Sequence, residues 1–247
     1  MASYLATIDI GKWRFVRGKT ASGIPELVAY DPALTAQVAK AHTVRLTGRV
    51  TDFWSRTFGR YPFSSTGAIV DNLPKIGFSL ETQTRPVYTA APGRVDVAHE
   101  LSHQWYGDSV SVRTWRNIWL NEGFATFAQY LWGEHTGGPS TYVALRSIYR
   151  SIPSSDPFWH LSVADPKRDT MFSGPVYARG GMTLAVLRHR LGDRTFFAIL
   201  RTWAAQHRYG NGDTQQFVRL AERISGQHLT HFFHRWLWAK RKPPSFG

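Results

Sequence analysis

The sequence predicts an α+β protein in which a small mixed sheet is followed by a mostly helical part. Before Gly93 the chain contains short runs that alternate apolar and polar residues, separated by Gly and Pro, as strands do. Beyond Gly93 its apolar residues recur at the spacing of three and four residues that is typical of helices. Hydrophobic residues make up 43% of the chain and aromatic ones 14%, which is enough for a folded core and unlike a disordered chain.

Composition narrows the classes of protein that fit. The 247 residues include no cysteine, so any bound metal must use imidazole or carboxylate ligands. The net charge is +13, but most of the excess is arginine spread singly along the chain, so we expect no nucleic-acid partner. The first residues lack the pattern of a signal peptide, and no stretch reaches the roughly 18 apolar residues of a membrane helix. We expect a cytoplasmic protein with no membrane partner, although a longer parent could be exported.

The start of the chain predicts two strands. Residues 4–16 alternate apolar and polar side chains, and residues 26–30 form a second extended run. A hairpin is marginal on its own, so these strands need a larger sheet to join. We expect residues 1–30 to be the last strands of an N-terminal β-domain that is mostly absent from this chain.

The rest of the chain predicts helices around one further set of strands. Helical spacing predicts one long helix over residues 32–58, and the segment after it predicts short strands that end in an extended run at 79–84. Later helices are expected at 95–106, 121–134, 175–191, 194–207, 213–225 and 228–239. Residues 31–240 are therefore expected to form the catalytic domain, and residues 241–247 a tail.

One predicted helix contains the motif H-E-x-x-H, as His99-Glu100-Leu101-Ser102-His103. Four residues is close to one helical turn, so His99 and His103 project from the same face and can bind one zinc ion. Glu100 lies too far round the helix to be a third ligand, but it can reach a water molecule on the open side of the metal. We expect Glu100 to be the general base.

The motif alone also occurs by chance on surface helices, so a third ligand is needed. Glu122 follows His103 after a gap of 18 residues, at the start of the next predicted helix. Two His and one Glu leave a fourth position for water, which is typical of a catalytic rather than a structural zinc site. We therefore expect one zinc ion per chain, bound by His99, His103 and Glu122.

Two segments closely resemble the zinc motif of the aminopeptidase N family of gluzincin peptidases: H-E-L-S-H-Q-W-Y-G-D-S-V at 99–110 and W-L-N-E-G-F-A at 119–125. The resemblance covers nearly the whole chain. It implies a thermolysin-like catalytic domain, with zinc in a cleft between the sheet and the helices. It also implies that Tyr177, in P-V-Y-A-R-G at 175–180, stabilises the oxyanion. A first helical turn suits that role because the positive end of the helix favours developing negative charge.

The same family has a short strand before the zinc helix with the pattern G-A-M-E-N, whose Glu binds the free α-amine of the substrate. Residues 78–82, F-S-L-E-T, keep only that Glu, as Glu81. Residues 79–86 nearly reproduce the A-L-E-T-Q-T-R-P form of some bacterial members. The resemblance therefore implies that Glu81 binds substrate. A carboxylate that pairs with an ammonium group would explain a preference for chain ends.

Gln129 departs from the family pattern. Seven residues after the Glu ligand the family commonly has an acid, whose carboxylate accepts a hydrogen bond from a metal-bound imidazole. An amide oxygen can accept the same bond without the charge, so metal affinity is expected to be lower. Asp108 and Asp96 are alternative partners. We expect His231 and His234, three residues apart with no third ligand nearby, to serve as helix surface and packing edge rather than as a second metal site.

These observations predict a zinc aminopeptidase that releases N-terminal residues from peptides. An endopeptidase or an epoxide hydrolase could use the same zinc ligands, and acetylation of the substrate amine would separate these activities. A non-catalytic scaffold of the same fold is the third alternative, although a scaffold has no need of the complete set of site residues. The preferred side chain of the substrate is not predicted.

A final expectation concerns residues 1–30. In the family, the preceding β-domain closes one wall of the cleft and supplies a Gln that helps to hold the substrate amine, and no position in this chain matches that Gln. We therefore expect the chain to bind zinc, to be a weak aminopeptidase by itself, and to self-associate or pair with another chain through its N-terminal strands.

Overall fold

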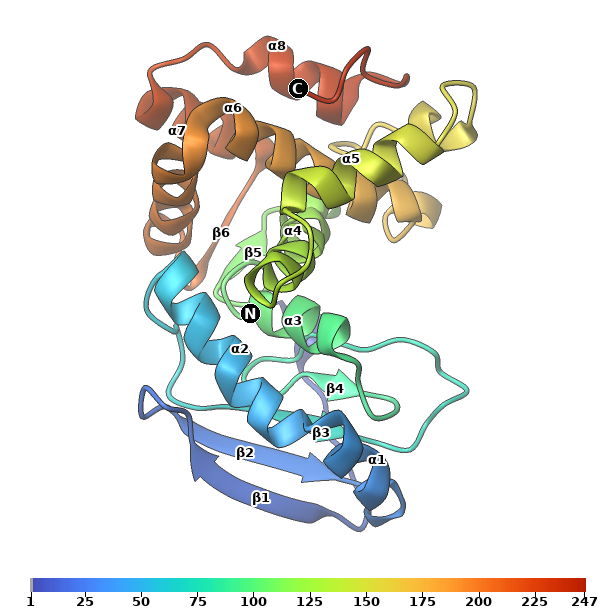
Figure 1. Cartoon of the computed structure of the whole chain (residues 1–247), viewed down its shortest axis with the longest axis vertical. Helices are drawn as coiled ribbons and strands as arrows, with labels where there is room; N and C mark the ends of the chain where they lie inside the picture. Colours follow the sequence, from blue (N-terminus) through green and yellow to red (C-terminus); the bar gives the residue numbers. More distant parts are fainter. Residues whose placement is uncertain (1) are drawn as a thin grey trace. The chain divides into compact units, whose positions relative to one another are not determined.

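A computed structural model describes residues 2–247 of the chain (Figure 1). These residues form two compact units, with the division after Ser109, and each unit is described separately. The first unit contains the mixed sheet and the helix that carries the H-E-x-x-H motif. The second unit is almost wholly helical. The predicted α+β class is confirmed.

A four-stranded sheet is the base of the first unit, with the order β1-β2-β3-β4. The strands are β1 (Arg14–Lys19), β2 (Pro25–Tyr30), β3 (Thr66–Val70) and β4 (Val87–Tyr88). The first pair is antiparallel, with Arg14 opposite Tyr30, and the other two pairs are parallel. The hairpin continues the sheet of β3 and β4, and its second strand lies where residues 26–30 predicted it. The first strand was predicted too early, at 4–16, because it begins only at Arg14 and Ser3–Leu5 form a 3₁₀ turn. That the hairpin also ends a preceding β-domain stays a prediction.

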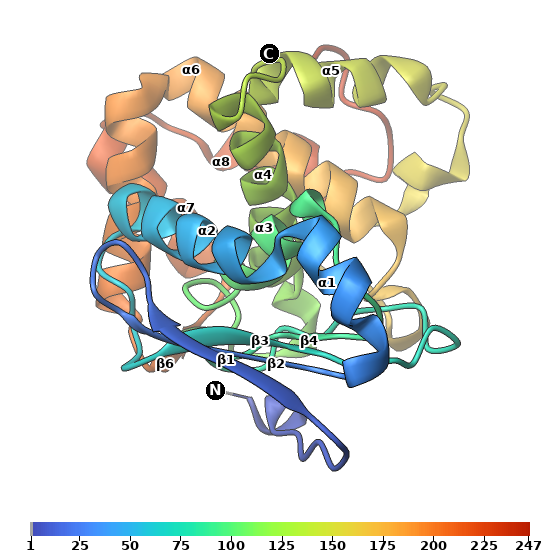
Figure 2. The same ribbon diagram turned by 60° about the horizontal axis from the view of Figure 1, so that its bottom comes forward.

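The segment after the hairpin is helical but is not the single long helix that we predicted. A short 3₁₀ turn, η2 (Pro32–Leu34), leads into α1 (Thr35–Ala41), and α2 (Thr43–Phe58) follows. His42 between them adopts the left-handed conformation with φ 53°, which breaks the helix. Figure 2 shows α1 and α2 lying across one face of the sheet. Trp54 and Phe58 of α2 are buried, and the ring of Phe58 packs edge-on against that of Tyr106.

The helix with the H-E-x-x-H motif is α3 (Arg94–Ser102), a little shorter than predicted. Its first turn is capped by Asp96, whose carboxylate accepts a hydrogen bond from the Gly93 amide at 2.9 Å. On its buried side, the indole of Trp54 donates to the Ala98 carbonyl at 3.2 Å. The helix that carries the motif is thereby held against α2.

The second unit consists mainly of helices. They are α4 (Trp119–His135), α5 (Thr141–Ser151), α6 (Gly174–Gln206), α7 (Thr214–Ser225) and α8 (Thr230–Phe233), which continues as a π-helical turn over His234–Trp238. A small parallel sheet joins β5 (Val110–Val112) to β6 (Gly210–Gly212), and neither of these strands was predicted. Short 3₁₀ turns occur at η3 (Trp115–Asn117), η4 (Pro157–His160) and η5 (Arg168–Thr170).

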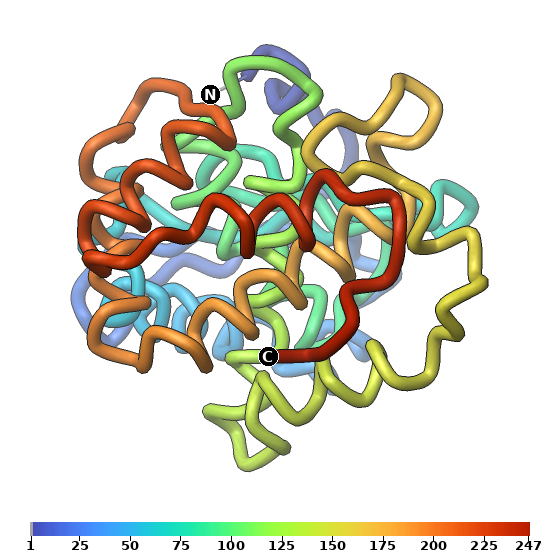
Figure 3. The backbone as a smooth tube through the Cα atoms, turned by 90° about the horizontal axis from the view of Figure 1, so that it is seen from above, coloured from blue at the N-terminus to red at the C-terminus, as the bar shows by residue number. Residues whose placement is uncertain are grey.

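The long helix α6 is interrupted at Gly192, which has φ 73° and ψ 160°. The predicted end of one helix before Gly192 and the start of another just after it are therefore confirmed. Figure 3 shows that the C-terminal segment, in red, returns alongside α6. No helix within residues 2–247 is both long and apolar enough to cross a lipid bilayer.

Candidate metal centre and active site

The two histidines of the H-E-x-x-H motif lie one turn apart at the C-terminal end of α3. Their ring centroids are 5.0 Å apart. His103 is buried, with 1% of its surface exposed, and His99 is half-buried. The spacing in the sequence therefore does place both imidazoles on one face of the helix.

The orientation of His103 suits metal binding. Its Nδ1 lies 3.0 Å from the backbone carbonyl of Tyr106. A carbonyl can only accept a hydrogen bond, so Nδ1 carries the proton and donates, and Nε2 keeps a lone pair for a metal. The chain passes close to this ring at Gly107, where a Cβ atom would lie 2.9 Å from Nδ1. Only glycine fits there without a shift of the imidazole.

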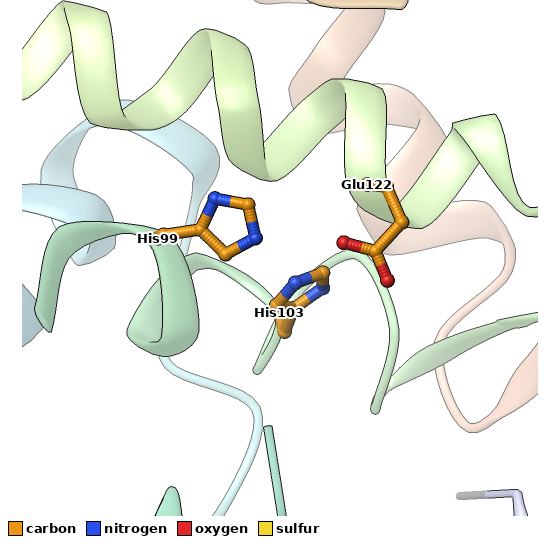
Figure 4. A group of neighbouring side chains, drawn as sticks. All are labelled: His99, His103 and Glu122. Atoms are coloured by element: carbon orange, nitrogen blue, oxygen red, sulfur yellow. The ribbon is translucent and has the colours of Figure 1, made fainter. Parts of the chain in front are cut away.

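Glu122, in the first turn of α4, is 4% exposed. One ligand atom from each of His99, His103 and Glu122 lies within 4.8 Å of the other two, and Figure 4 shows the three side chains together. Two imidazoles and one carboxylate are the ligand set of many catalytic zinc sites. Because Nε2 of His103 carries the lone pair of the ring, these residues fit a zinc ion.

A second group in the first unit brings Glu81, Glu100 and His103 together, again with ligand atoms within 4.8 Å of one another. Glu81 is 6% exposed. The phenol of Tyr4, in the 3₁₀ turn η1 (Ser3–Leu5), donates to Glu81 Oε1 at 3.1 Å. The predicted amine-binding carboxylate and the predicted general base are therefore neighbours.

The segment that follows Glu81 is fixed by the buried amide of Gln104, which comes directly after His103. Its Oε1 accepts a hydrogen bond from the Thr84 amide at 2.7 Å, and its Nε2 donates to the Thr82 carbonyl at 3.3 Å. One side chain next to a predicted zinc ligand thus fixes the segment of Glu81. This explains why an amide that can both accept and donate occupies position 104. The strand predicted at 79–84 is wrong, because in the part of the chain that the structure describes this segment pairs only through the single bridge of Leu80 with Val87.

Asp108 is a buried acid beside this group. It is 1% exposed, and within residues 2–247 neither carboxylate oxygen has a hydrogen-bond partner. Burial raises its pKa well above the usual range; nearby His103 opposes the rise, and Glu81 and Glu100 add to it. The other alternative partner, Asp96, caps α3 instead. Gln129 is half-buried, and its predicted effect on metal affinity stays a prediction.

Tyr177 lies in the first turn of α6, where Pro175 occupies one of the first two positions. It is half-buried rather than packed in the core. Both its place in the helix and its partial exposure suit a phenol that donates a hydrogen bond to a substrate.

Comparison with known proteins decides the family. Residues 94–236, more than half of the chain, match the Peptidase family M1 domain. The chain belongs to peptidase family M1. Aminopeptidase N of Lactococcus lactis subsp. cremoris is 26% identical over 96% of this chain and 31% of its own length.

Solved M1 structures also match. The M1 zinc metallopeptidase of Deinococcus radiodurans superimposes with a TM-score of 0.79 at 26% identity, over 94% of this chain and 52% of that one. A variant of that enzyme bound to the substrate Tyr-Ser-Ala gives a TM-score of 0.77 at 25% identity, covering 94% and 53%. This M1 chain therefore spans about a third of its aminopeptidase N relative and about half of the solved structures.

Two glycines connect the motifs of the second unit in this M1 chain. A Cβ atom built on Gly123, next to Glu122, would lie 2.8 Å from the Cα of Gly180, three residues after Tyr177. The helices α4 and α6 therefore cross with their backbones in contact. This close crossing fixes the predicted ligand Glu122 relative to the predicted oxyanion donor Tyr177.

Arg179 fastens the same turn of α6 to the end of the chain. Its side chain is fully buried, and its guanidinium donates to five backbone carbonyls: those of Trp159, Leu161, Arg235, Ala239 and Arg241. Burial lowers its pKa to about 10. The Arg of the P-V-Y-A-R-G segment thus acts as a structural anchor two residues from Tyr177.

The sequence alone did not identify three of these contributions. Tyr4 is 77 residues from Glu81, and no local pattern marks the contact. The carbonyl of Tyr106 carries no side-chain signal at all. The structural role of Arg179 could not be predicted from its motif, because its five acceptors are backbone carbonyls that only the fold brings together.

Proposed function

We propose that this chain is the catalytic part of a zinc-dependent aminopeptidase that releases N-terminal residues from peptides. The observation that supports this proposal most directly is the convergence of two groups on His103: the predicted zinc ligands, and the pair Glu81 and Glu100. Membership of family M1 and the peptide bound in a related solved structure favour the same activity.

Each residue of the site is assigned one role in the proposed reaction. His99, His103 and Glu122 would hold zinc, which when bound supplies a Lewis acid that polarises a peptide carbonyl and acidifies water. Glu100 would accept the proton of the attacking water and return it to the leaving amine. Tyr177 would donate a hydrogen bond to the oxygen that becomes negatively charged.

Glu81 would select substrates with a free N-terminus. It is a buried carboxylate close to the general base, so an ammonium group bound to it would place the first peptide bond of a substrate near Glu100. Tyr4 donates to one carboxylate oxygen, Oε1, which leaves Oε2 for the amine. An internal peptide segment has no charge to offer at this position.

Metal analysis combined with one assay tests the proposal. We expect one zinc per chain, hydrolysis of alanyl and leucyl anilides, and no hydrolysis of the N-acetylated forms. Equal cleavage of free and acetylated substrates would favour an endopeptidase. A purified chain that binds no zinc and cleaves nothing would favour a scaffold.

We also propose that the chain is cytoplasmic and that it self-associates through its N-terminal strands. The second proposal is supported by β1, an edge strand with Phe15 51% exposed, and by the exposed side chains of Ile8 and Ile10 that precede it. Fractionation of cells that produce the native protein tests the location.

A further inference from the structure

The second unit contains a pocket of about 470 Å³. Its walls come from α6, from residues 228–236 around α8, and from the C-terminal residues 243–247. Figure 3 allows the reader to follow the red C-terminal segment beside α6. Neither Glu122 nor Tyr177 lines this pocket, so the proposed peptidase function does not account for it.

Apart from Ser245, the polar side chains that line the pocket are arginines and histidines. They are His189, Arg190, His228, His231 and Arg235, all of them exposed. No Asp or Glu is among the lining residues. The floor is apolar, with Val186, Phe232 and Trp236 buried beneath the rim. A pocket with this lining favours a negatively charged ligand.

Arg190 and Arg235 each have a contact that orients the guanidinium, but among the described residues neither is paired with a carboxylate. Nε of Arg190 donates to Oε1 of Gln227 at 3.0 Å, and Nε of Arg235 is directed at Nε2 of His231 at 3.5 Å. Neither acceptor is a carboxylate, and both contacts use Nε alone, so the two terminal nitrogens of each guanidinium remain for another partner. Within residues 2–247 no carboxylate forms an ion pair with either arginine.

Arg188, two residues before Arg190 on α6, shows the contrast. Its guanidinium is paired with both Glu134 and Asp193, at 3.0 Å and 2.8 Å. The fold therefore supplies carboxylates to an arginine of α6 outside the pocket and supplies none to Arg190 or Arg235 inside it.

We propose that this pocket binds a small ligand that carries two or more linked oxyanion groups. The planar fork of a guanidinium matches an oxyanion with two parallel hydrogen bonds, and two such forks from different helices match two linked groups. The pocket volume is many times the roughly 30 Å³ of one water molecule in the liquid, so it can hold more than one small ion. The buried apolar floor strengthens the charge interactions by excluding water.

Calorimetric titration of the full chain with inorganic triphosphate at low salt tests the proposal. We expect one triphosphate per chain. The pair Arg190→Gln and Arg235→Gln should weaken binding by at least about tenfold, because each loses charged hydrogen bonds. The matched pair Arg194→Gln and Arg219→Gln removes the same charge from exposed arginines outside the pocket, and should change the affinity by less than about twofold.

Two results would overturn the proposal: no binding, or an equal loss in both arginine pairs, which would indicate diffuse attraction to a basic chain. Triphosphate also binds zinc, so His103→Ala is the second control. Binding that disappears in His103→Ala and persists in the pocket pair would place the anion at the metal. If the pocket pair fails to fold, Arg190→Lys, which keeps the charge but loses the fork, should still weaken binding. A parallel titration with citrate assigns the ligand to phosphates or to carboxylates.

Discussion

A substitution at Glu100 can test catalysis without disturbing metal binding. Glu100 follows the predicted ligand His99 and neighbours His103 and Glu81. We expect Glu100→Gln to lower kcat by about 10²–10⁴-fold, because it removes the general base. The zinc content should not change, because no ligand is lost. Steady-state kinetics on leucyl anilide and metal analysis of the same preparation measure both quantities.

His103→Ala is the complementary variant. It removes an imidazole whose other nitrogen is already held by the Tyr106 carbonyl, so we expect it to lose zinc as well as activity. Stoichiometric zinc in this variant, or wild-type kcat in Glu100→Gln, would contradict the assigned roles.

Tyr4 and Glu81 form a pair that a double-mutant cycle can test. We expect Glu81→Gln to weaken binding of leucine amide at least about tenfold, because it removes the charge partner of the amine. Tyr4→Phe removes only the hydroxyl that holds Oε1, and should weaken binding by about threefold to tenfold. Calorimetry with leucine amide measures both affinities, and N-acetyl-leucine amide is the control ligand.

The cycle distinguishes two failures. If Glu81→Gln leaves the affinity unchanged, Glu81 does not bind the amine. A second failure is possible when Glu81→Gln does weaken binding. If Tyr4→Phe then leaves the affinity unchanged, or lowers it equally in the wild-type and Glu81→Gln backgrounds, the Tyr4 hydroxyl does not act through Glu81. Tighter binding in Tyr4→Phe would mean that the phenol competes with the substrate for the carboxylate.

At the scale of elements, the crossing of α4 and α6 depends on glycine at the contact. Gly123→Ala would place a methyl group 2.8 Å from the Gly180 Cα, so we expect a loss of about 1–3 kcal/mol in the free energy of unfolding. Gly133, further along α4, has no atom within 4 Å of an added Cβ. Gly133→Ala should therefore stabilise the helix by up to about 1 kcal/mol. Urea unfolding of both variants measures the difference, and equal effects would argue against a close crossing.

A half-buried charge network joins α4, α5 and α6. Glu134 accepts hydrogen bonds from the Thr141 amide and hydroxyl, both at 2.6 Å, and from Arg188 at 3.0 Å. Burial opposes ionisation, but the bonds from Arg188 and Thr141 outweigh it and lower the pKa of Glu134 below its ordinary 4.5. A lowered pKa in the folded state means that the network stabilises the fold above pH 4.5 and loses its effect as the pH falls through the folded-state pKa.

We therefore expect Glu134→Gln to be less stable than the wild type at neutral pH, by about 1–3 kcal/mol. The difference should shrink as the pH falls below the ordinary pKa of the carboxyl group. Unfolding curves in urea at neutral and acidic pH measure it. A difference that does not depend on pH would show that the charge of Glu134 contributes nothing.

The elements that the sequence predicts well are those with a local signal. The kink lies at Gly192, before which a helix was predicted to end, and α7 (Thr214–Ser225) lies within one residue of the helix predicted at 213–225. The single helix over residues 32–58 was wrong because apolar spacing continues across His42, and nothing in the pattern shows the left-handed turn there. The strands β5 and β6 were missed because each has three residues and pairs with a partner about a hundred positions away.

The residues of the candidate site likewise differ in how well the sequence predicts them. His99, Glu100 and His103 could be found from spacing, since one helix positions them. Glu81 needed a resemblance, because its neighbours in space come from another segment. Its hydrogen bond from Tyr4 could not be found at all, because it depends on how the N-terminal turn packs.

At the scale of the whole molecule, the exposed N-terminal strand predicts association. β1 is at the edge of its sheet, and Ile8, Ile10 and Phe15 are 88%, 92% and 51% exposed. We expect the chain to form dimers or larger species that light scattering after size-exclusion chromatography detects. Replacing the three residues by Ser should reduce the association.

A matched control for this experiment lies in the second unit. Val143 on α5 is 55% exposed, and Val143→Ser removes a comparable apolar side chain from another surface. A chain that is monomeric at all concentrations, or one whose association responds equally to Val143→Ser, would contradict the role of the N-terminal strands.

The buried guanidinium of Arg179 limits where this chain can be truncated or cut. Three of its five acceptors are carbonyls of Arg235, Ala239 and Arg241, which a truncation in the last helix would remove. The cation would then remain in an apolar interior with most of its donors unmet, which costs more than the contacts of the deleted residues themselves. A shortened protein should thus lose the helix that presents Tyr177, so a fusion partner or a cleavage site is better placed in an exposed loop such as residues 136–139.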